Sequence, residues 1–117
     1  MPTYDYTAVQ ARLDKWGLLP LLERAHQTRL TRDGAITYAR AILGRKAHVR
    51  VKRIRRSWAH ADGSISLSCD SARSVRLRCV LHECAHVLND RKGSKLSDES
   101  HGEAFCRTYA RLLREVM

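Results

Sequence analysis

The sequence has no run of apolar residues long enough to cross a membrane. A membrane-spanning helix needs about 18 or more consecutive, mainly apolar residues, and no segment of the 117-residue chain approaches this. The first residues, Met1-Pro2-Thr3-Tyr4-Asp5, also lack the basic-then-apolar order of a secretory signal peptide. We therefore expect a cytoplasmic protein without a membrane partner.

Cysteine is sparse, and its spacing excludes the common cysteine frameworks. Cys69, Cys79, Cys84 and Cys106 form no C-x-x-C pair, so neither a zinc ribbon nor a dithiol redox motif is expected. In a reducing compartment all four stay free thiols. Buried thiols behave as small hydrophobic side chains, and a core role is expected for most of them.

Acidic residues are few, and none occurs between Asp33 and Asp62. The chain has 12 Asp and Glu against 22 Lys and Arg, a formal net charge of +10, which attracts polyanions. A basic strand beside an aromatic residue suits phosphate contacts and base stacking, although a solvated edge strand protected from aggregation by its charge has the same pattern. Nucleic acid is thus one expected partner, and Trp58 itself is expected in the core. The basic residues before Trp58 are Arg45, Lys46, Arg50, Lys52, Arg53, Arg55 and Arg56.

Proline and glycine are also scarce, and no linker or repeat divides the chain, so we expect a single domain over residues 1–117. Apolar residues at helical spacing predict helices over residues 7–16, from Pro20 onward, and between an N-cap at Thr31 and a C-terminal glycine at Gly44. Helical spacing returns after residue 71 and persists to about Asn89. A last helix is predicted from the capping-box pair Ser100 and Glu103.

Between these helices, residues 48–68 alternate in polarity, which is typical of strands. Asp62-Gly63 is typical of a two-residue hairpin turn. Counting outward from that turn pairs Trp58 with Leu67 and predicts an antiparallel hairpin with both side chains on its core face. Helices followed by a small antiparallel sheet and two further helices indicate an α+β fold.

The predicted helix before residue 90 contains an H-E-x-x-H motif, His82-Glu83-Cys84-Ala85-His86. Two residues four apart lie on one face of a helix, so both imidazoles can reach the same metal ion. Zinc prefers such ligands in tetrahedral geometry, and a catalytic site keeps one position open for water. Glu83 follows the first ligand, where it can take a proton from that water as it attacks a peptide carbonyl. The motif predicts a zinc-dependent hydrolase with one Zn²⁺ per chain.

Such a site needs a third protein ligand, and the candidates downstream are Asp90, Asp98, Glu99 and His101. We favour His101, because it lies in the first turn of the last predicted helix, on the side of Phe105. Glu99 precedes the predicted capping box and is the next alternative.

Two motifs, His82-Glu83-x-x-His86 and His101-Gly102-x-x-Phe105, occur in this order in the sequence. Together they resemble the SprT-like metalloproteases, which include the Spartan proteases of DNA–protein crosslink repair, and also compact bacterial and phage zincins. The resemblance covers residues from about 64 to 113.

This resemblance implies a minimal zincin-like fold in which His82, His86 and His101 bind zinc and Glu83 is the general base. It also implies that Phe105 packs beneath the site. In zincins an edge strand beside the metal-binding helix holds an extended substrate, and residues 64–69 are the candidate for that strand. A protein or peptide substrate is the expected partner of such a site.

Two residues are candidates for stabilising an oxyanion in the transition state, His60 near the predicted hairpin tip and Tyr109 one turn beyond Phe105. Two other functions remain open. One is a metal-dependent nuclease acting on single-stranded nucleic acid, which the charge favours but Glu83 disfavours. The other is a non-catalytic nucleic-acid-binding module stabilised by zinc, in which a fourth protein ligand would close the site.

Overall fold

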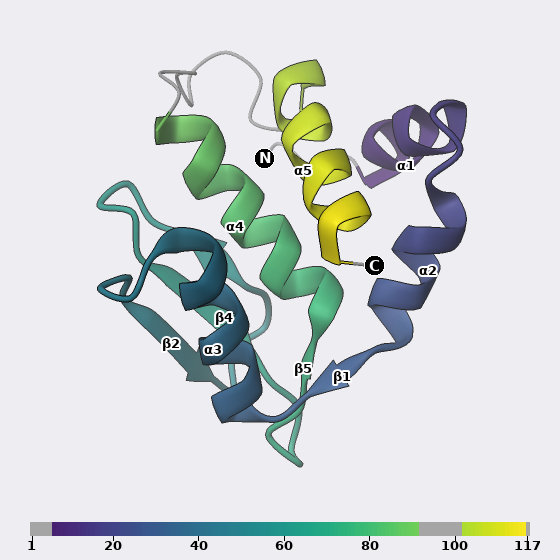
Figure 1. Cartoon of the computed structure of the whole chain (residues 1–117). Coiled ribbons are helices and arrows are strands. Elements are labelled where there is room, and N and C mark those ends of the chain that lie inside the picture. The colour runs from purple at the N-terminus through teal and green to yellow at the C-terminus, as the bar shows by residue number, and fades with distance from the viewer. Residues whose placement is uncertain (1–5, 92–101, 117) are drawn as a thin grey trace.

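The computed structural model describes residues 6–91 and 102–116. It confirms the α+β fold class. No helix in these two segments is both long and apolar enough to span a bilayer. The elements shown in Figure 1 are α1 (Tyr6–Lys15), α2 (Leu19–Gln27), β1 (Arg29–Leu30), α3 (Arg32–Leu43), β2 (Val49–Lys52), β3 (Trp58–Ala59), β4 (Ile65–Ser68), β5 (Val75–Arg76), α4 (Leu77–Arg91) and α5 (Glu103–Val116).

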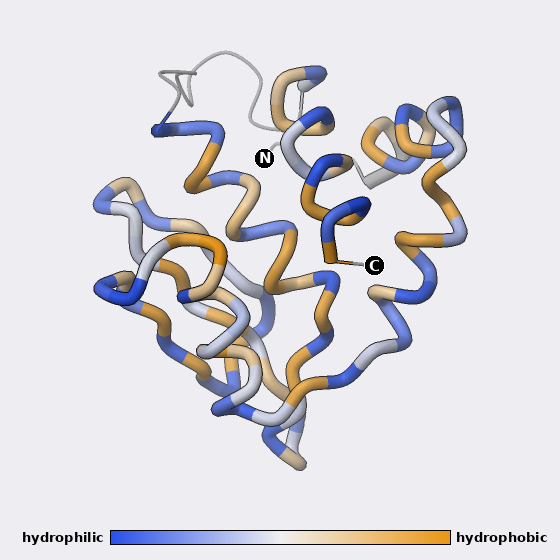
Figure 2. Tube along the Cα trace, in the orientation of Figure 1, coloured by the Kyte–Doolittle hydropathy of each residue, from blue (hydrophilic) through white to orange (hydrophobic). Residues whose placement is uncertain are grey.

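Helix α4 is the central element of the fold (Figure 1). It contacts α2, α3, α5 and strands β3, β4 and β5. None of its residues before Arg91 is exposed. Hydrophobic and hydrophilic positions alternate along α4 and α5 in Figure 2, and the apolar side chains of α4 meet those of its neighbours. Nearly the whole circumference of α4 is therefore in contact with the rest of the protein.

The predicted ends of α3 are confirmed. The Thr31 side chain accepts a hydrogen bond from the backbone N–H of Gly34 at 3.0 Å, which satisfies one of the unpaired donors of the first turn. Gly44 ends the helix with φ at 117°, a conformation that a side chain would disfavour. Each of these signals depends only on residues within one helical turn, which is why both ends of α3 could be predicted from the sequence.

The main sheet differs from the predicted antiparallel hairpin. Its strand order is β2-β4-β3, and β2 runs parallel to β4, with Val49 opposite Ile65 and Val51 opposite Leu67. Only β3 is antiparallel to β4. Alternating polarity identifies strands but does not encode their relative direction. Strand β4 lies between the other two, so the prediction that residues 64–69 form the edge strand is wrong.

The hairpin that joins β3 to β4 has a three-residue loop instead of the predicted two-residue turn. The backbone N–H of Gly63 donates to the carbonyl of His60, and that of His60 donates to the carbonyl of Ser64. Gly63 has φ at 90°, as expected for a type I turn closed by a left-handed glycine. The extra loop residue moves the register by one, so Trp58 lies opposite Ser66 and not Leu67.

This shift reverses the face on which Trp58 lies. Leu67 and Ile65 are fully buried on the face that meets the helices, whereas Trp58 is 51% exposed. The predicted core position of Trp58 is therefore wrong, because side chains on a strand change face with each one-residue change in register. His60 accompanies Trp58 to the outer face.

Helix α4 also begins later than predicted. A turn at residues 70–74 and strand β5 precede it, and Val75 of β5 pairs with Leu30 of β1. The turn is held by the Asp70 carboxylate, which accepts hydrogen bonds from the backbone N–H groups of Ala72 and Ser74. An Asp side chain that binds the following backbone in this way competes with helix formation.

Candidate metal centre

His82, Glu83 and His86 come together on α4 as a group that could hold a metal ion. One ligand atom from each residue lies within 4.8 Å of the other two. His82 and Glu83 are almost completely buried, at 4% and 7% exposure. The helix explains the arrangement of the imidazoles, because positions four apart fall on one face, and their ring centroids are 4.9 Å apart.

Aromatic side chains of α5 form one wall of this group. The ring of Phe105 stacks on the imidazole of His86 at 4.3 Å and meets that of His82 edge-on at 4.9 Å. Tyr109 presents its ring to His82 at 5.5 Å. Both aromatic residues are buried. They restrict the rotation of the imidazoles and so orient their nitrogen atoms.

Burial changes the acid–base behaviour of Glu83. Removal from water disfavours its ionised form and raises its pKa from 4.5 to about 7, while the positive charge of Arg56 acts in the opposite direction. The effect of Arg56 also shows that the loop before β3 approaches the metal centre. A carboxyl group with a pKa near neutrality can both accept and return a proton under physiological conditions.

The two imidazoles are suitable donors for a zinc ion, which binds imidazole nitrogen at roughly 2.0–2.1 Å. Their ligand atoms and a carboxylate oxygen of Glu83 lie within 4.8 Å of one another, so a carboxylate stands beside the position that the two imidazoles could share. Burying a carboxyl beside two imidazoles is costly without a compensating partner. A bound cation would supply that compensation, as would a proton on Glu83.

The other predicted ligands are placed differently. Asp98, Glu99 and His101, together with the capping residue Ser100, lie outside the residues that the structure describes. Asp90 is described, at the end of α4, and does not belong to the group that could hold a metal ion. The third protein ligand therefore stays a prediction.

The two candidates for oxyanion stabilisation have different surroundings. Tyr109 borders His82, as described above. His60 forms a hydrogen bond through Nε2 with Ser66 Oγ at 2.9 Å and lies on the outer face of the sheet. The structure thus brings Tyr109, and not His60, next to the metal centre.

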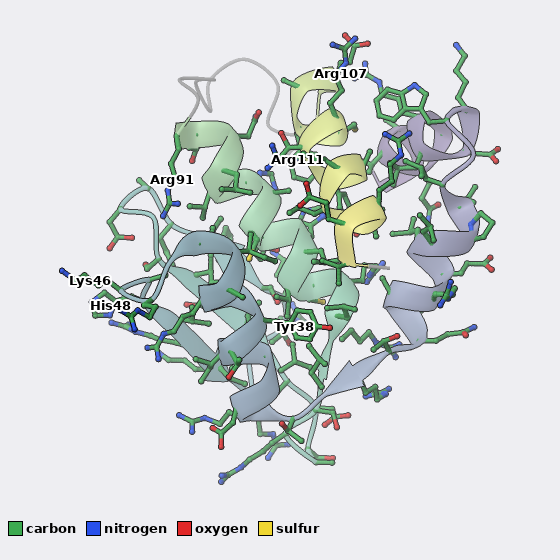
Figure 3. All side chains as sticks on the ribbon, viewed as in Figure 1. Tyr38, Lys46, His48, Arg91, Arg107 and Arg111 are labelled. Carbon is green, nitrogen blue, oxygen red and sulfur yellow. The ribbon has the colours of Figure 1, made fainter. Side chains whose placement is uncertain are left out.

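A cavity of about 670 Å³ opens one helical turn beyond His86. It is enclosed by the loop after α3 (residues 44–48), the hairpin tip (residues 61–64) and the last turn of α4. Figure 3 shows Lys46 and His48 at this side of the molecule, with Arg91 above them at the end of α4. Arg91 also donates a hydrogen bond to the carbonyl of Leu43 at 3.0 Å, which ties α4 to α3. The lining is mixed in charge, with Arg45, Lys46 and Arg91 on one hand and Asp62 and Asp90 on the other.

Two features of the site were not predicted from the sequence, the cavity and the approach of Arg56 to Glu83. Both depend on how loops fold back in space. The loop that carries Arg56 is fixed by Ser68, whose backbone N–H donates to Ser57 Oγ at 2.8 Å and whose hydroxyl donates to the carbonyl of Ile54. No residue spacing in the sequence indicates these hydrogen bonds.

Comparison with known proteins identifies no relative: no protein-family model, no curated protein and no solved structure matches the chain.

Proposed function

We propose that this chain is a zinc-dependent peptidase of the zincin type, with His82 and His86 as metal ligands. The observation that carries the proposal is the buried His82–Glu83–His86 group, which has the helical spacing of an H-E-x-x-H site. Zinc held there would act as a Lewis acid on the substrate carbonyl. The protein contributes the fixed imidazoles and a dry environment that strengthens electrostatic interactions.

In this proposal Glu83 is the general base. Burial raises its pKa to about 7 in the absence of metal, and its carboxylate form can take the proton of an attacking water and then deliver that proton to the departing amine. Bound cationic metal would favour the ionised carboxylate and thereby lower this pKa. Glu83 is buried against the site and can exchange its proton there without competition from bulk water.

We propose His101 as the third ligand, and with it a relationship to the SprT-like proteases. The support is the chain connection: His101 is four residues from Phe105, whose ring stacks on His86. The motif His101-Gly102-x-x-Phe105 therefore includes, four residues after His101, an aromatic residue that contacts the metal centre. We also propose Tyr109 as the residue that stabilises the oxyanion, because of its contact with His82.

The exposed edge of the sheet beside α4 favours a peptide, and not a nucleic acid, as the substrate at the metal centre. Strand β3 is the edge strand beside α4, and it has no further strand on its outer side in the described part of the chain. An exposed strand edge can bind an extended peptide through main-chain hydrogen bonds. Trp58–Ala59 thus replaces residues 64–69 as our candidate for the substrate-binding strand.

The metal assignment is tested by zinc analysis of purified protein. We expect about one zinc per chain, lost in His82→Ala and in His86→Ala, and bound more weakly in His101→Ala. Thr37→Ala, on the exposed side of α3, is the matched control and should retain zinc. Full zinc content in both His82→Ala and His86→Ala would overturn the assignment.

The activity is tested by hydrolysis of labelled casein, with labelled single-stranded RNA as the competing substrate. Glu83→Gln should keep its zinc and lose several orders of magnitude in kcat, because the amide cannot accept a proton. Tyr109→Phe should keep zinc and folding while kcat falls by about 10²-fold. Cleavage of RNA but not casein, abolished by His82→Ala, would instead establish the nuclease. Zinc binding without either cleavage would establish the non-catalytic module.

A further inference from the structure

In the described residues, helices α3 and α4 pack on one face of the β2-β4-β3 sheet, and the other face is exposed at β2 and β3, although Ser66 in its centre is buried. The register places Val49, Val51, Ile65 and Leu67 on the inner face, against α3 and α4. In Figure 1, α3 lies in front of β2 and β4, so the outer face is turned away from the viewer. The outer face, which we call the open face, carries Arg50 and Lys52 from β2, Ser66 and Ser68 from β4, Trp58 from β3, and His60, which directly follows β3.

The open face and the loop beside it are strongly basic. The loop between β2 and β3 adds Arg53, Arg55 and Arg56. None of the basic side chains from residue 45 to residue 56 takes part in an ion pair within the described segments. The neighbouring carboxylates are already engaged: Asp70 pairs with Arg29 at 2.6 Å, and Asp62 accepts hydrogen bonds from Ser64. The positive charge of this face is therefore uncompensated.

Trp58 gives the open face an aromatic surface. Its side chain is 51% exposed, which is unusual for a residue with so much apolar area. The guanidinium of Arg56 lies 4.6 Å from the ring centroid in a cation–π contact. The loop that carries Arg56 is fixed to β4 through Ser57 and Ser68. The indole ring and the guanidinium thus form an ordered stack, and a further flat group, such as a base, can stack on it.

We propose that the open face is a binding surface for single-stranded nucleic acid, with Trp58 as the stacking platform and Arg50 and Lys52 as phosphate contacts. Stacking on an exposed aromatic ring is tolerant of base identity, and a basic groove follows the phosphate backbone. The hydroxyl groups of Ser66 and Ser68 are already engaged, by His60 and by the carbonyl of Ile54, so the phosphate contacts are assigned to the two cationic side chains of β2. The inner face of the same strands is apolar and packed, so binding requires no rearrangement of the core.

The open face adjoins the metal centre but uses different groups. A peptide substrate would use the main-chain edge of β3, whereas nucleic acid would use the ring of Trp58 and the cationic side chains of β2. Arg56 links the two regions, because it contacts the ring of Trp58 and its charge acts on Glu83. The inference therefore goes beyond the proposed peptidase activity and does not depend on it. An acidic peptide has the same charge as nucleic acid but offers no flat bases for Trp58, so nucleic acid accounts for more of the observations.

Binding is measured by fluorescence in the Trp16→Phe variant, in which Trp58 is the sole tryptophan. A single-stranded oligothymidylate should quench this fluorescence and bind more tightly than either duplex DNA or poly-glutamate. The Trp58→Ala substitution should lower the affinity roughly 5- to 150-fold, as measured by the fluorescence anisotropy of a labelled oligonucleotide. The matched control is Tyr38→Ala, which removes an exposed aromatic residue of α3 (Figure 3) and should change the affinity less than about twofold.

The phosphate contacts are measured by the salt dependence of affinity. Each phosphate neutralised on a single strand contributes a slope of about −0.7 in log affinity against log salt, so Arg50→Gln with Lys52→Gln should flatten the slope by about 1.4. The control Arg24→Gln with Arg114→Gln removes the same charge from exposed positions on α2 and α5 and should leave the slope unchanged. Circular dichroism and zinc content establish folding independently.

Three results would overturn the inference: wild-type affinity in Trp58→Ala, equal slopes in the two double variants, or poly-glutamate binding as tight as that of the oligonucleotide. The last result would assign the open face to acidic proteins. A loss of casein hydrolysis in Glu83→Gln with unchanged oligonucleotide binding would support both proposals. If the wild-type protein hydrolyses no casein but still binds the oligonucleotide through Trp58, only the proposed peptidase activity would be refuted.

Discussion

Replacing Glu83 by Gln should stabilise the metal-free protein at neutral pH. Burial raises the pKa of Glu83 from 4.5 to about 7, so between these values the folded state holds a proton that the unfolded state releases. Folding stability contributed by this group is therefore present below about pH 4.5, is lost as the pH rises towards 7, and stays lost above it. A difference of 2.5 pKa units corresponds to about 3 kcal/mol. Gln is neutral throughout and removes this loss.

The assay is urea denaturation in the presence of a chelator, at several pH values from 4 to about 8. The free energy of unfolding of Glu83→Gln, relative to wild type, should increase by about 3 kcal/mol across this range. Glu23→Gln, which removes an exposed carboxylate on α2, is the control and should give a curve close to wild type. Parallel curves for Glu83→Gln and wild type would refute the proposed effect of burial.

Two further predictions concern the scaffold. Thr31→Ala should lower the free energy of unfolding by about 1 kcal/mol, because it removes the N-cap hydrogen bond to Gly34; thermal denaturation checks this, and an effect no larger than that of Thr37→Ala would contradict the cap. Gly63→Ala should cost roughly 1 kcal/mol through its positive φ alone, since a Cβ there would meet no atom within 4 Å. Gly63→Asn should cost less than Gly63→Ala in the same measurement, and the reverse order would argue against a left-handed conformation at this turn.

The sequence was most informative where the determinants are local. The Thr31 cap, the Gly44 end and the four-residue spacing of His82 and His86 all act within one or two helical turns, and the structure has each of them. A periodic apolar pattern over such a segment leaves few alternatives. The fold class followed from the order of these segments.

Features that depend on pairing between distant segments could not be predicted in the same way. The parallel direction of β2 and β4 and the one-residue shift at Trp58 are decided by packing of Val49 and Ile65 against the helices and by a loop of three residues instead of two. Both loop lengths are compatible with Asp62-Gly63. The contact of Phe105 with His86 joins two helices that are separated by residues 92–101, so no local pattern determined its geometry.

The order of strands in the sheet also has a consequence for how the chain folds. Strands β3 and β4 are joined by a short loop and can pair early, whereas β2 precedes both in the sequence and can pair only with β4. Closing the longer segment from β2 to β4 costs more chain entropy than closing the hairpin, and this cost must be met before the parallel contacts form. We therefore expect β2, with its cationic side chains, to join a preformed hairpin late. Mutual repulsion among these side chains would then slow a late step of folding, and that step would accelerate as salt screens the charges.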